Sequence, residues 1–286
     1  MFYVDGIVVR RWETARPFQK VDGEQSVPVS GVPSLGFTAN GNHLLSVSER
    51  GGGSEISIRD FPSPTAAPKS MVELKDIRIG DLTVSPDGRR FVFATHRHPQ
   101  YTLEFWEQSQ DGPQQLDIAN LETGHPGSFW CTAFSPDDET LASGHRDGAI
   151  RLWDIGGGQL KLRETVPDVH WGGVGGLDYS PYGNALASVD WGGEVKLWDT
   201  SGGRVHSKAN LGRHDARAYK VRFSPDGRIL ASGDFSGVIK LWPVGETSQA
   251  TILTSHTACI TSLDFTPDGR KLLSSGNDGR VIVWDL

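Results

Sequence analysis

The 286-residue sequence predicts an all-β protein built from repeated four-stranded antiparallel sheets. Three observations support this prediction: a turn sequence recurs along nearly the whole chain, alternating apolar residues flank the turns, and no segment carries a helical stripe of apolar residues. The composition agrees, because 35 glycines and 16 prolines accompany 9 tryptophans. Abundant turn residues together with abundant large aromatic residues are typical of many short strands.

A turn of the form Ser-Pro-Asp-Gly, or close to it, occurs five times, and a weaker copy lies nearer the N-terminus. Pro presets the φ angle of the second position, Asp can bond its own backbone two residues on, and Gly accepts a positive φ. Successive copies begin 47, 50, 45, 44 and 42 residues apart, which suits one four-stranded sheet and is too long for a helical hairpin. The copies occupy residues 38–41, 85–88, 135–138, 180–183, 224–227 and 266–269.

The strands of one repeat can be justified in order. Residues 219–223 alternate apolar and polar side chains before the turn, and residues 228–232 form an apolar run after it, which predicts a β-hairpin. A second turn such as Asp147-Gly148 precedes a β-branched third strand, here at 149–154. A fourth strand, for instance at 203–207, then leads to the next Gly- or His-containing loop.

The third strands carry the most specific signal, because five of them end in a Trp-Asp pair or a variant of it. On these residues and the period, the chain resembles the WD-repeat family of β-propellers, in which each repeat corresponds to one blade of a ring. The resemblance implies a single β-propeller over residues 1–286, with six recognisable repeats. The five pairs are Trp106-Glu107, Trp153-Asp154, Trp198-Asp199, Trp242-Pro243 and Trp284-Asp285. The repeats run approximately over residues 14–60, 61–107, 108–154, 155–199, 200–242 and 243–286, and residues 1–13 supply an extra strand or partial blade.

The same resemblance implies a hydrogen-bonded set in each blade: a His before the first strand, a Ser or Thr on the second, an Asp in the next turn and the Trp of the third. Buried together, these groups satisfy one another's hydrogen bonds. The spacing is regular here, since four His residues each stand 10 positions before the turn Ser or Thr, and four Ser residues each stand 10 before the Trp. The two complete sets are His125, Ser143, Asp147 and Trp153, and His256, Ser274, Asp278 and Trp284.

The remaining repeats depart from this pattern. Gly192 and Ser236 stand where the turn Asp belongs in the fourth and fifth repeats, and Asp190 and Asp234 come two residues earlier. The set is therefore absent or rerouted there. The first two repeats lack the His, and the first has Arg59-Asp60 in place of the Trp-Asp pair.

The blade number stays open between six and seven. The chain stops at Leu286, directly after a third strand, while residues 5–13 look like another third strand. WD-repeat propellers usually close their ring with an N-terminal segment that forms the outer strand of the last blade, and a strand within about 17–22 suits this role. We favour such a closed ring over a seventh, incomplete blade or a chain cut from a longer reading frame.

Charge and composition exclude several classes of function. With 28 Lys+Arg against 35 Asp+Glu, the net charge of -7 offers no basic excess for nucleic acid and weakly favours basic partners. No run of about 20 apolar residues exists, so we expect no membrane span. Cys131 and Cys259 are too few for a disulfide framework and are expected to be buried structural thiols, and the N-terminus lacks a signal-peptide pattern. We therefore expect a cytoplasmic protein.

The sequence contains no convincing catalytic constellation. Ser, His and Asp recur at fixed repeat offsets, which favours bonds within blades over a catalytic triad, and neither a Gly-x-Ser-x-Gly elbow nor a phosphate loop is present. We therefore expect that the protein is not an enzyme and that it needs no cofactor or metal. One alternative is a metal-dependent enzyme or binder that uses His96, His98 and His145, although no carboxylate or thiolate completes a ligand spacing there.

The expected function is a non-catalytic protein-protein interaction scaffold that binds a peptide or partner loop on the central face of the propeller. In WD-repeat proteins that face is formed by the turns after the second strands and the loops that enter the first strands. Trp191 is the preferred centre, because its turn gives the large ring little to pack against. Trp130 and Tyr219 fit core packing equally well. The alternative is an architectural subunit that uses its blade sides. The full candidate set is Trp191, Arg146, Trp171, Phe235, Arg97, Trp130, Arg217, Tyr219 and Asn277.

Overall fold

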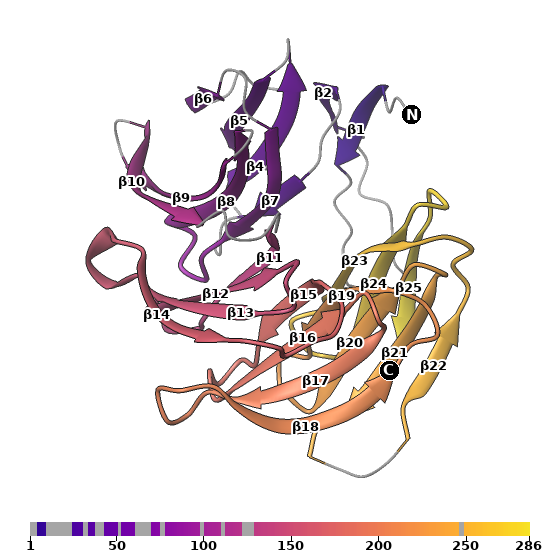
Figure 1. Ribbon diagram of the computed structural model, residues 1–286. Coiled ribbons are helices and arrows are strands. Elements are labelled where there is room, and N and C mark those ends of the chain that lie inside the picture. The colour runs from indigo at the N-terminus through magenta and orange to yellow at the C-terminus, as the bar shows by residue number, and fades with distance from the viewer. Residues whose placement is uncertain are drawn as a thin grey trace. The chain divides into compact units, whose positions relative to one another are not determined.

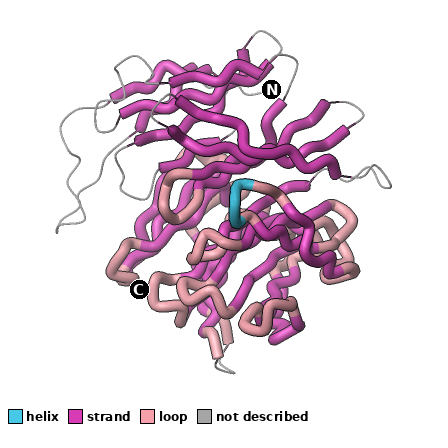
Figure 2. The backbone as a smooth tube through the Cα atoms, turned by 90° about the vertical axis from the view of Figure 1, so that its left-hand side faces the viewer, coloured by secondary structure: helices cyan, strands magenta, loops and turns pink. Residues whose placement is uncertain are grey.

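The computed structural model describes the whole chain except residues 1–4, 10–24, 31–33, 38–42, 51–52, 61–69, 75–77, 98–99, 110–111, 122–128 and 246–248. The described residues form strands β1 to β25 and one short 3-10 turn, η1 (Gly156–Gly158), and they contain no α-helix (Figure 2). In this described part, no helix combines the length and the apolar character that a membrane crossing requires. The all-β expectation is therefore confirmed.

The chain divides into two compact units, Met1–Gly124 with Gly157–Leu160, and His125–Gly156 with Lys161–Leu286. In the first unit, β1 (Asp5–Val9) pairs with β2 (Gln25–Ser30). Two four-stranded sheets follow in this unit. One contains β3 (Ser34–Phe37), β4 (His43–Arg50), β5 (Gly53–Asp60) and β6 (Ser70–Leu74), and the other contains β7 (Arg78–Val84), β8 (Arg90–Arg97), β9 (Gln100–Ser109) and β10 (Gly112–Leu121).

The second unit holds three four-stranded sheets and one three-stranded sheet among its described residues. In every sheet the strands lie in sequence order and neighbours are antiparallel. The strands are β11 (Phe129–Phe134), β12 (Thr140–His145), β13 (Ile150–Asp154) and β14 (Lys161–Val166); β15 (Val174–Tyr179), β16 (Ala185–Asp190), β17 (Glu194–Asp199) and β18 (His206–Arg213); β19 (Ala218–Phe223), β20 (Ile229–Asp234), β21 (Val238–Pro243) and β22 (Thr251–Thr254); and β23 (Ile260–Phe265), β24 (Lys271–Gly276) and β25 (Val281–Asp285).

Within the second unit the sheets are arranged like blades. The first strands β11, β15, β19 and β23 lie side by side in this order, and β14, β18 and β22 lie at the outside (Figure 1). Apolar side chains fill the space between neighbouring sheets: Trp198 packs in one cluster with Leu152 and Val174, and Trp242 packs in another with Val195. Each sheet thus buries a face that it could not cover alone.

The sequence repeats and the sheets are out of phase by one strand. Repeat 108–154 ends with β13, whereas the outer strand β14 that pairs with β13 lies in repeat 155–199. The last sheet shows three strands among the described residues, and the segment 17–22 expected to complete it lies outside them. The expected fourth strand at 203–207 is shifted, since β18 begins at His206 and a turn precedes it, with Gly203 at φ 74°.

The recurring turns are held by side-chain bonds that the sequence motif supplies. In the fifth repeat the Ser224 hydroxyl donates to Asp226 (2.6 Å) and accepts from the Ile229 N–H (2.9 Å), and Gly227 takes φ 66°. The hydrogen bond from Ser224 holds the pKa of Asp226 below its usual value. Where Tyr182 replaces the Asp in the fourth repeat, the Asn184 amide oxygen accepts from Ser180 instead (3.0 Å).

Candidate functional site

We number the sheets of three or four strands in chain order, so that β3–β6 form the first sheet and β23–β25 the sixth and last. A chain of hydrogen bonds between four residues crosses the fifth sheet, β19–β22. Ser232, fully buried on β20, accepts from the Trp242 indole N–H (2.8 Å) and lies 2.7 Å from His214 Nε2. His214 Nδ1 lies 3.0 Å from an Asp234 carboxylate oxygen. Because this carboxylate accepts a hydrogen bond from Nδ1–H, Nε2 is the acceptor for the Ser232 hydroxyl, and all four side chains have a hydrogen-bond partner.

Equivalent bonds occur in the fourth and sixth sheets. Ser188 joins His170 Nε2 (2.7 Å) to the Trp198 N–H (2.8 Å), and in the last sheet Ser274 joins His256 (2.8 Å) to Trp284 (2.9 Å). The acids differ in position. Asp278 comes from the turn, whereas Asp190 and Asp234 are the last residues of β16 and β20, so these two acids replace the missing turn carboxylates.

The hydrogen bonds also control the charge of these acids. Burial alone would raise the pKa of Asp234, but hydrogen bonds from His214, Ser236 and the Val238 N–H hold it below its usual value. Asp278 shows the same balance, because burial opposes ionisation while the Thr257 N–H and His256 hold its pKa at about 2. These carboxylates therefore remain charged acceptors near neutral pH.

The third sheet uses a different imidazole among the described residues. Ser143 accepts from the Trp153 N–H (2.8 Å) and contacts Nε2 of His145 (2.8 Å), which stands two residues further along β12. Asp147 accepts from the Ala149 N–H and pairs with Arg151 (2.9 Å). His125, the imidazole expected for this set, lies outside the described residues.

The alternative of a histidine metal site finds little support in the part that the structure describes. His145 is buried with Nε2 against Ser143, and burial lowers its pKa to about 3. The side chain of His96 and all of His98 lie outside the described residues. Cys131 is buried on β11, whereas Cys259, expected to be buried as well, is only half-buried and precedes β23.

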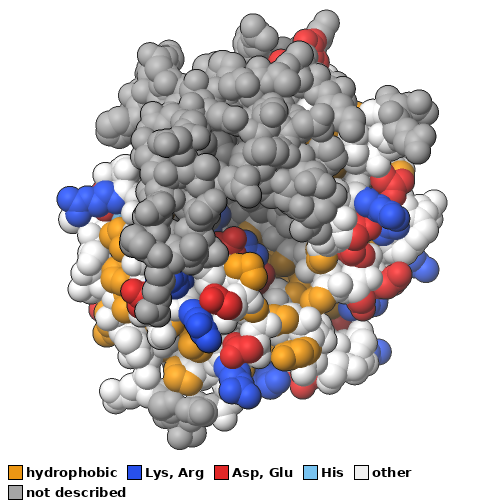
Figure 3. All heavy atoms as spheres, turned by 180° about the vertical axis from the view of Figure 1, so that it is seen from behind, with side chains coloured by type: hydrophobic (Ala, Val, Ile, Leu, Met, Phe, Trp, Pro, Cys, Tyr) orange, Lys and Arg blue, Asp and Glu red, His pale blue; other side chains and the backbone are white. Residues whose placement is uncertain are grey.

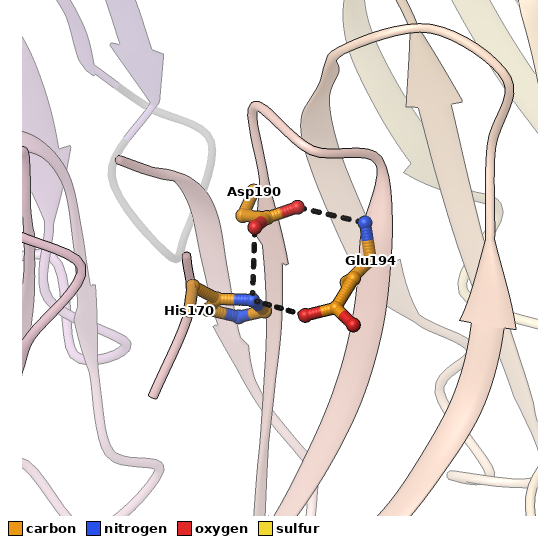
Figure 4. Close-up of side chains that lie close together, drawn as sticks. All are labelled: His170, Asp190 and Glu194. Atoms are coloured by element: carbon orange, nitrogen blue, oxygen red, sulfur yellow. Dashed lines mark hydrogen bonds and ion pairs between the residues drawn. The ribbon is translucent and has the colours of Figure 1, made fainter. Parts of the chain in front are cut away.

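One cluster on the fourth sheet could present three ligands to a cation. His170 Nδ1 lies 3.4 Å from Asp190 and 3.7 Å from Glu194 (Figure 4). However, Lys196 Nζ lies 2.8 Å from the Val169 carbonyl and 2.7 Å from the same Glu194 oxygen that faces His170, and Asp190 accepts the Glu194 N–H (2.7 Å). An ammonium already neutralises the carboxylate, so the cluster is a local variant of the His–Asp pair.

On the face seen in Figure 3, charges of both signs lie among hydrophobic side chains, so charge alone does not single out a binding site there. The end of the second unit's sheets that carries the turns after β12, β16, β20 and β24 has a distinct feature, and we call this end the Trp191 edge. An open pocket of about 430 Å³ lies there between the fourth and fifth sheets. It is lined by Trp191, Gly192, Arg213, Asp215, Ala216, Arg217 and Phe235.

The pocket brings together three candidate residues from separate turns. The Arg217 guanidinium lies 5.5 Å from the centre of the Trp191 ring, and the Phe235 N–H donates to the Arg217 carbonyl (2.8 Å). Tyr219 packs against Phe235, with 6.1 Å between ring centres. Arg213 and Asp215 belong to the same pocket and were missed from the sequence, although they flank the regularly spaced His214 on either side.

The other candidates are distributed around this pocket. The loop carrying Trp171 is tied to the Trp191 turn, because the Trp191 N–H donates to the Gly173 carbonyl (3.1 Å). Trp171 itself is fully exposed, and Arg146 is exposed on the neighbouring sheet's turn. Asn277 is exposed in the equivalent turn of the last sheet, away from the pocket lining. The side chains of Arg97 and Trp130 lie outside the described residues.

Comparison with known proteins identifies the repeats independently. Four segments match the family model described as WD domain, G-beta repeat, at residues 118–154, 163–199, 206–243 and 247–285. The chain is 34% identical over 77 residues to WD repeat and SOCS box-containing protein 1 of Danio rerio, a match that covers 27% of this chain and 17% of that protein. It is 32% identical over 118 residues to Protein lethal(2)denticleless of Drosophila melanogaster, covering 40% and 14%. It is 29% identical over 125 residues to Serine-threonine kinase receptor-associated protein of Dictyostelium discoideum, covering 43% and 37%. The matches thus span well under half of each relative's length.

Proposed function

Because the chain belongs to the WD-repeat family, we propose that it is a non-catalytic protein-interaction scaffold that binds a peptide or partner loop at the Trp191 edge. The observation that carries the proposal is the group of aromatic side chains at this edge. Trp171 is fully exposed and Phe235 is 59% exposed. Trp191 lines the pocket together with Phe235 and Arg217. Aromatic and Arg side chains carry a disproportionate share of binding energy at protein interfaces.

The backbone around these side chains supports a preformed site. The Trp191 turn is bonded to the Gly173 carbonyl and the Phe235 turn to the Arg217 carbonyl, so each turn is fixed to the loop beside it. A surface fixed before binding loses less conformational entropy when a partner docks. The arrangement therefore suits recognition of a short segment without rearrangement of the scaffold.

The buried hydroxyls support the non-catalytic part of the proposal. Ser188 and Ser232 are fully buried and each serves both a His and a Trp, so neither hydroxyl can reach a substrate. A second candidate function is an architectural subunit that binds through its blade sides. It is favoured by exposed Leu162 on β14 and exposed Ile252 on β22, both on outer strands.

A capture experiment separates the two functions. The wild-type chain and a Trp191→Ala/Arg146→Glu variant are immobilised, and the proteins retained from lysate of the source cells are identified by mass spectrometry. The matched control is Tyr182→Ala/Arg228→Glu, which changes an exposed aromatic and an exposed Arg in turns at the opposite end of the fourth and fifth sheets. Loss of a partner in the first variant only is expected. Retention by both variants, with loss after Leu162→Ser/Ile252→Ser, would favour the blade sides.

We also propose that the N-terminal segment closes the ring as the fourth strand of the last sheet. The support is that β13, β17 and β21 each pair with an outer strand, whereas β25 carries exposed Val281 and Val283 where such a strand would lie. Removal of residues 1–24 is then expected to accelerate amide hydrogen exchange in β25 and to leave β21 unchanged. Equal exchange of β25 in both chains would contradict closure by this segment.

A further inference from the structure

We infer that the pocket at the Trp191 edge takes a carboxylate-bearing side chain next to a large apolar one, so that the scaffold's partner is an acidic peptide segment. This inference rests on the proposed function and adds the chemistry of the partner. It runs against the net charge of -7, which by itself favours basic partners.

The charged side chains that line the pocket are two arginines, Arg213 and Arg217, and one acid, Asp215. On the wider Trp191 edge, Arg146 and Arg280 are exposed, and so are the acids Asp147 and Asp168.

Several acids of this edge are already engaged. Asp190 and Asp234 are buried against imidazoles, Asp278 faces His256, Asp147 pairs with Arg151 and Glu194 with Lys196. Asp190, Asp234 and Asp278 keep their charge, but each is held against an imidazole below the surface, so the charged groups that an approaching segment can contact directly are mainly the exposed arginines. An Asp or Glu of that segment can accept hydrogen bonds from these guanidinium groups, whereas a Lys or Arg cannot.

The position of Arg217 fits a carboxylate better than a cation. Its guanidinium already lies over the Trp191 ring at 5.5 Å, so an incoming cation would find that aromatic face occupied by a like charge. The guanidinium is planar, and its contact with the ring restricts the orientation of its N–H donors, which suits bidentate bonding to a carboxylate. Arg213 is also held in place, since it donates to the Gly192 carbonyl (3.0 Å).

The apolar side of the pocket, formed by Phe235, favours a large apolar residue next to the Asp or Glu of the peptide. Phe235 is 59% exposed and its ring packs against Tyr219, so it offers an apolar surface beside the two arginines that line the same pocket. The volume of about 430 Å³ lies toward the lower end of the range for small ligand pockets and suits one or two side chains. An Asp or Glu next to an aromatic or branched aliphatic residue satisfies both walls.

The test is a selection from a random-peptide display library on the immobilised full chain, run in parallel on Arg217→Gln and on the control Arg228→Gln. Peptides enriched on the wild type are synthesised in two forms, one with Asp and Glu and one with Asn and Gln, and their affinities are measured by fluorescence polarisation. We expect Asp or Glu beside a large apolar residue in the enriched set. We also expect the amide form to bind roughly tenfold or more weakly, and Arg217→Gln to abolish this difference.

Each contrary outcome is decisive. Enrichment of Lys or Arg, enrichment without charge bias, no enrichment, or equal binding of the acidic peptide to wild type and Arg217→Gln would overturn the inference. Cellular partners captured by the wild type and lost in Trp191→Ala/Arg146→Glu would still support the scaffold function in that case. The acidic preference and the scaffold function therefore fail separately.

Discussion

Replacement of Ser232 by Ala should destabilise the protein far more than the loss of one hydroxyl suggests. The hydroxyl accepts from Trp242 (2.8 Å) and donates to His214 (2.7 Å), and both partners are buried with it. Ala would leave one buried donor and one buried acceptor without partners, and each such group costs about 1–3 kcal/mol. The expected loss in the free energy of unfolding is therefore about 2–6 kcal/mol.

The assay is urea unfolding of wild type and variant, followed by tryptophan fluorescence and by far-ultraviolet circular dichroism so that coincident transitions establish a single step. The matched control is Ser201→Ala, because Ser201 is exposed and donates to Asp199 at the surface, so water can replace its hydroxyl. The control should change stability by no more than about 0.5 kcal/mol. Equal effects of Ser232→Ala and Ser201→Ala would refute the argument that the buried chain of bonds stabilises the sheet.

Three further predictions concern other parts of the second unit. Burial lowers the pKa of His145 to about 3, so between that value and about 6.5 the unfolded chain binds a proton that the folded chain does not, and stability falls as the pH drops. His145→Gln should remove about 2 kcal/mol from the difference in unfolding free energy between pH 7 and pH 5, and an unchanged difference would show that this residue does not titrate as argued. Gly193 and Gly203 share a positive φ, but a Cβ at Gly193 would lie 2.4 Å from the His214 carbonyl oxygen whereas one at Gly203 meets nothing within 4 Å. Gly203→Ala should cost about 1–2 kcal/mol and Gly193→Ala clearly more in urea unfolding, and similar costs would contradict the close approach. Trp171→Ala should leave stability within about 0.5 kcal/mol of wild type, since the side chain is fully exposed, and should reduce partner capture.

Regular spacing predicted the repeating structure well. The alternation at 219–223 became β19, and the 10-residue interval between Ser188 and Trp198 became a buried hydrogen bond, because equal intervals on paired antiparallel strands bring equivalent side chains together. The fourth strand was harder to locate. Strand β18 carries mostly exposed side chains, so no alternating pattern marks its start at His206.

Departures from the spacing needed the structure. The regular spacing places Gly192 at the position of the turn Asp, and it does not decide whether Asp190 replaces that Asp as the carboxylate beside His170. The answer depends on how the end of β16 is oriented toward His170. Ser143 and His145 had a usable signal, since residues two apart on a strand share a face. The pocket had no signal of this kind. It depends on which loops of neighbouring sheets meet, and the residues of those loops are spread along the sequence from Trp191 to Phe235.

The one-strand offset between repeats and sheets determines how the chain would behave as separate fragments. A nick between Gly202 and Gly203, in the exposed loop that joins β17 to β18, leaves two polypeptides that still share the fourth sheet through the β17–β18 ladder. A nick in the loop before β19 cuts between sheets, so that on either side of the cut the described strands of the two polypeptides meet through side-chain packing and turn contacts and not through a ladder. Fragment complementation is therefore favoured for the nick between Gly202 and Gly203, because reassembly there restores the β17–β18 strand pairing in addition to the packing between sheets.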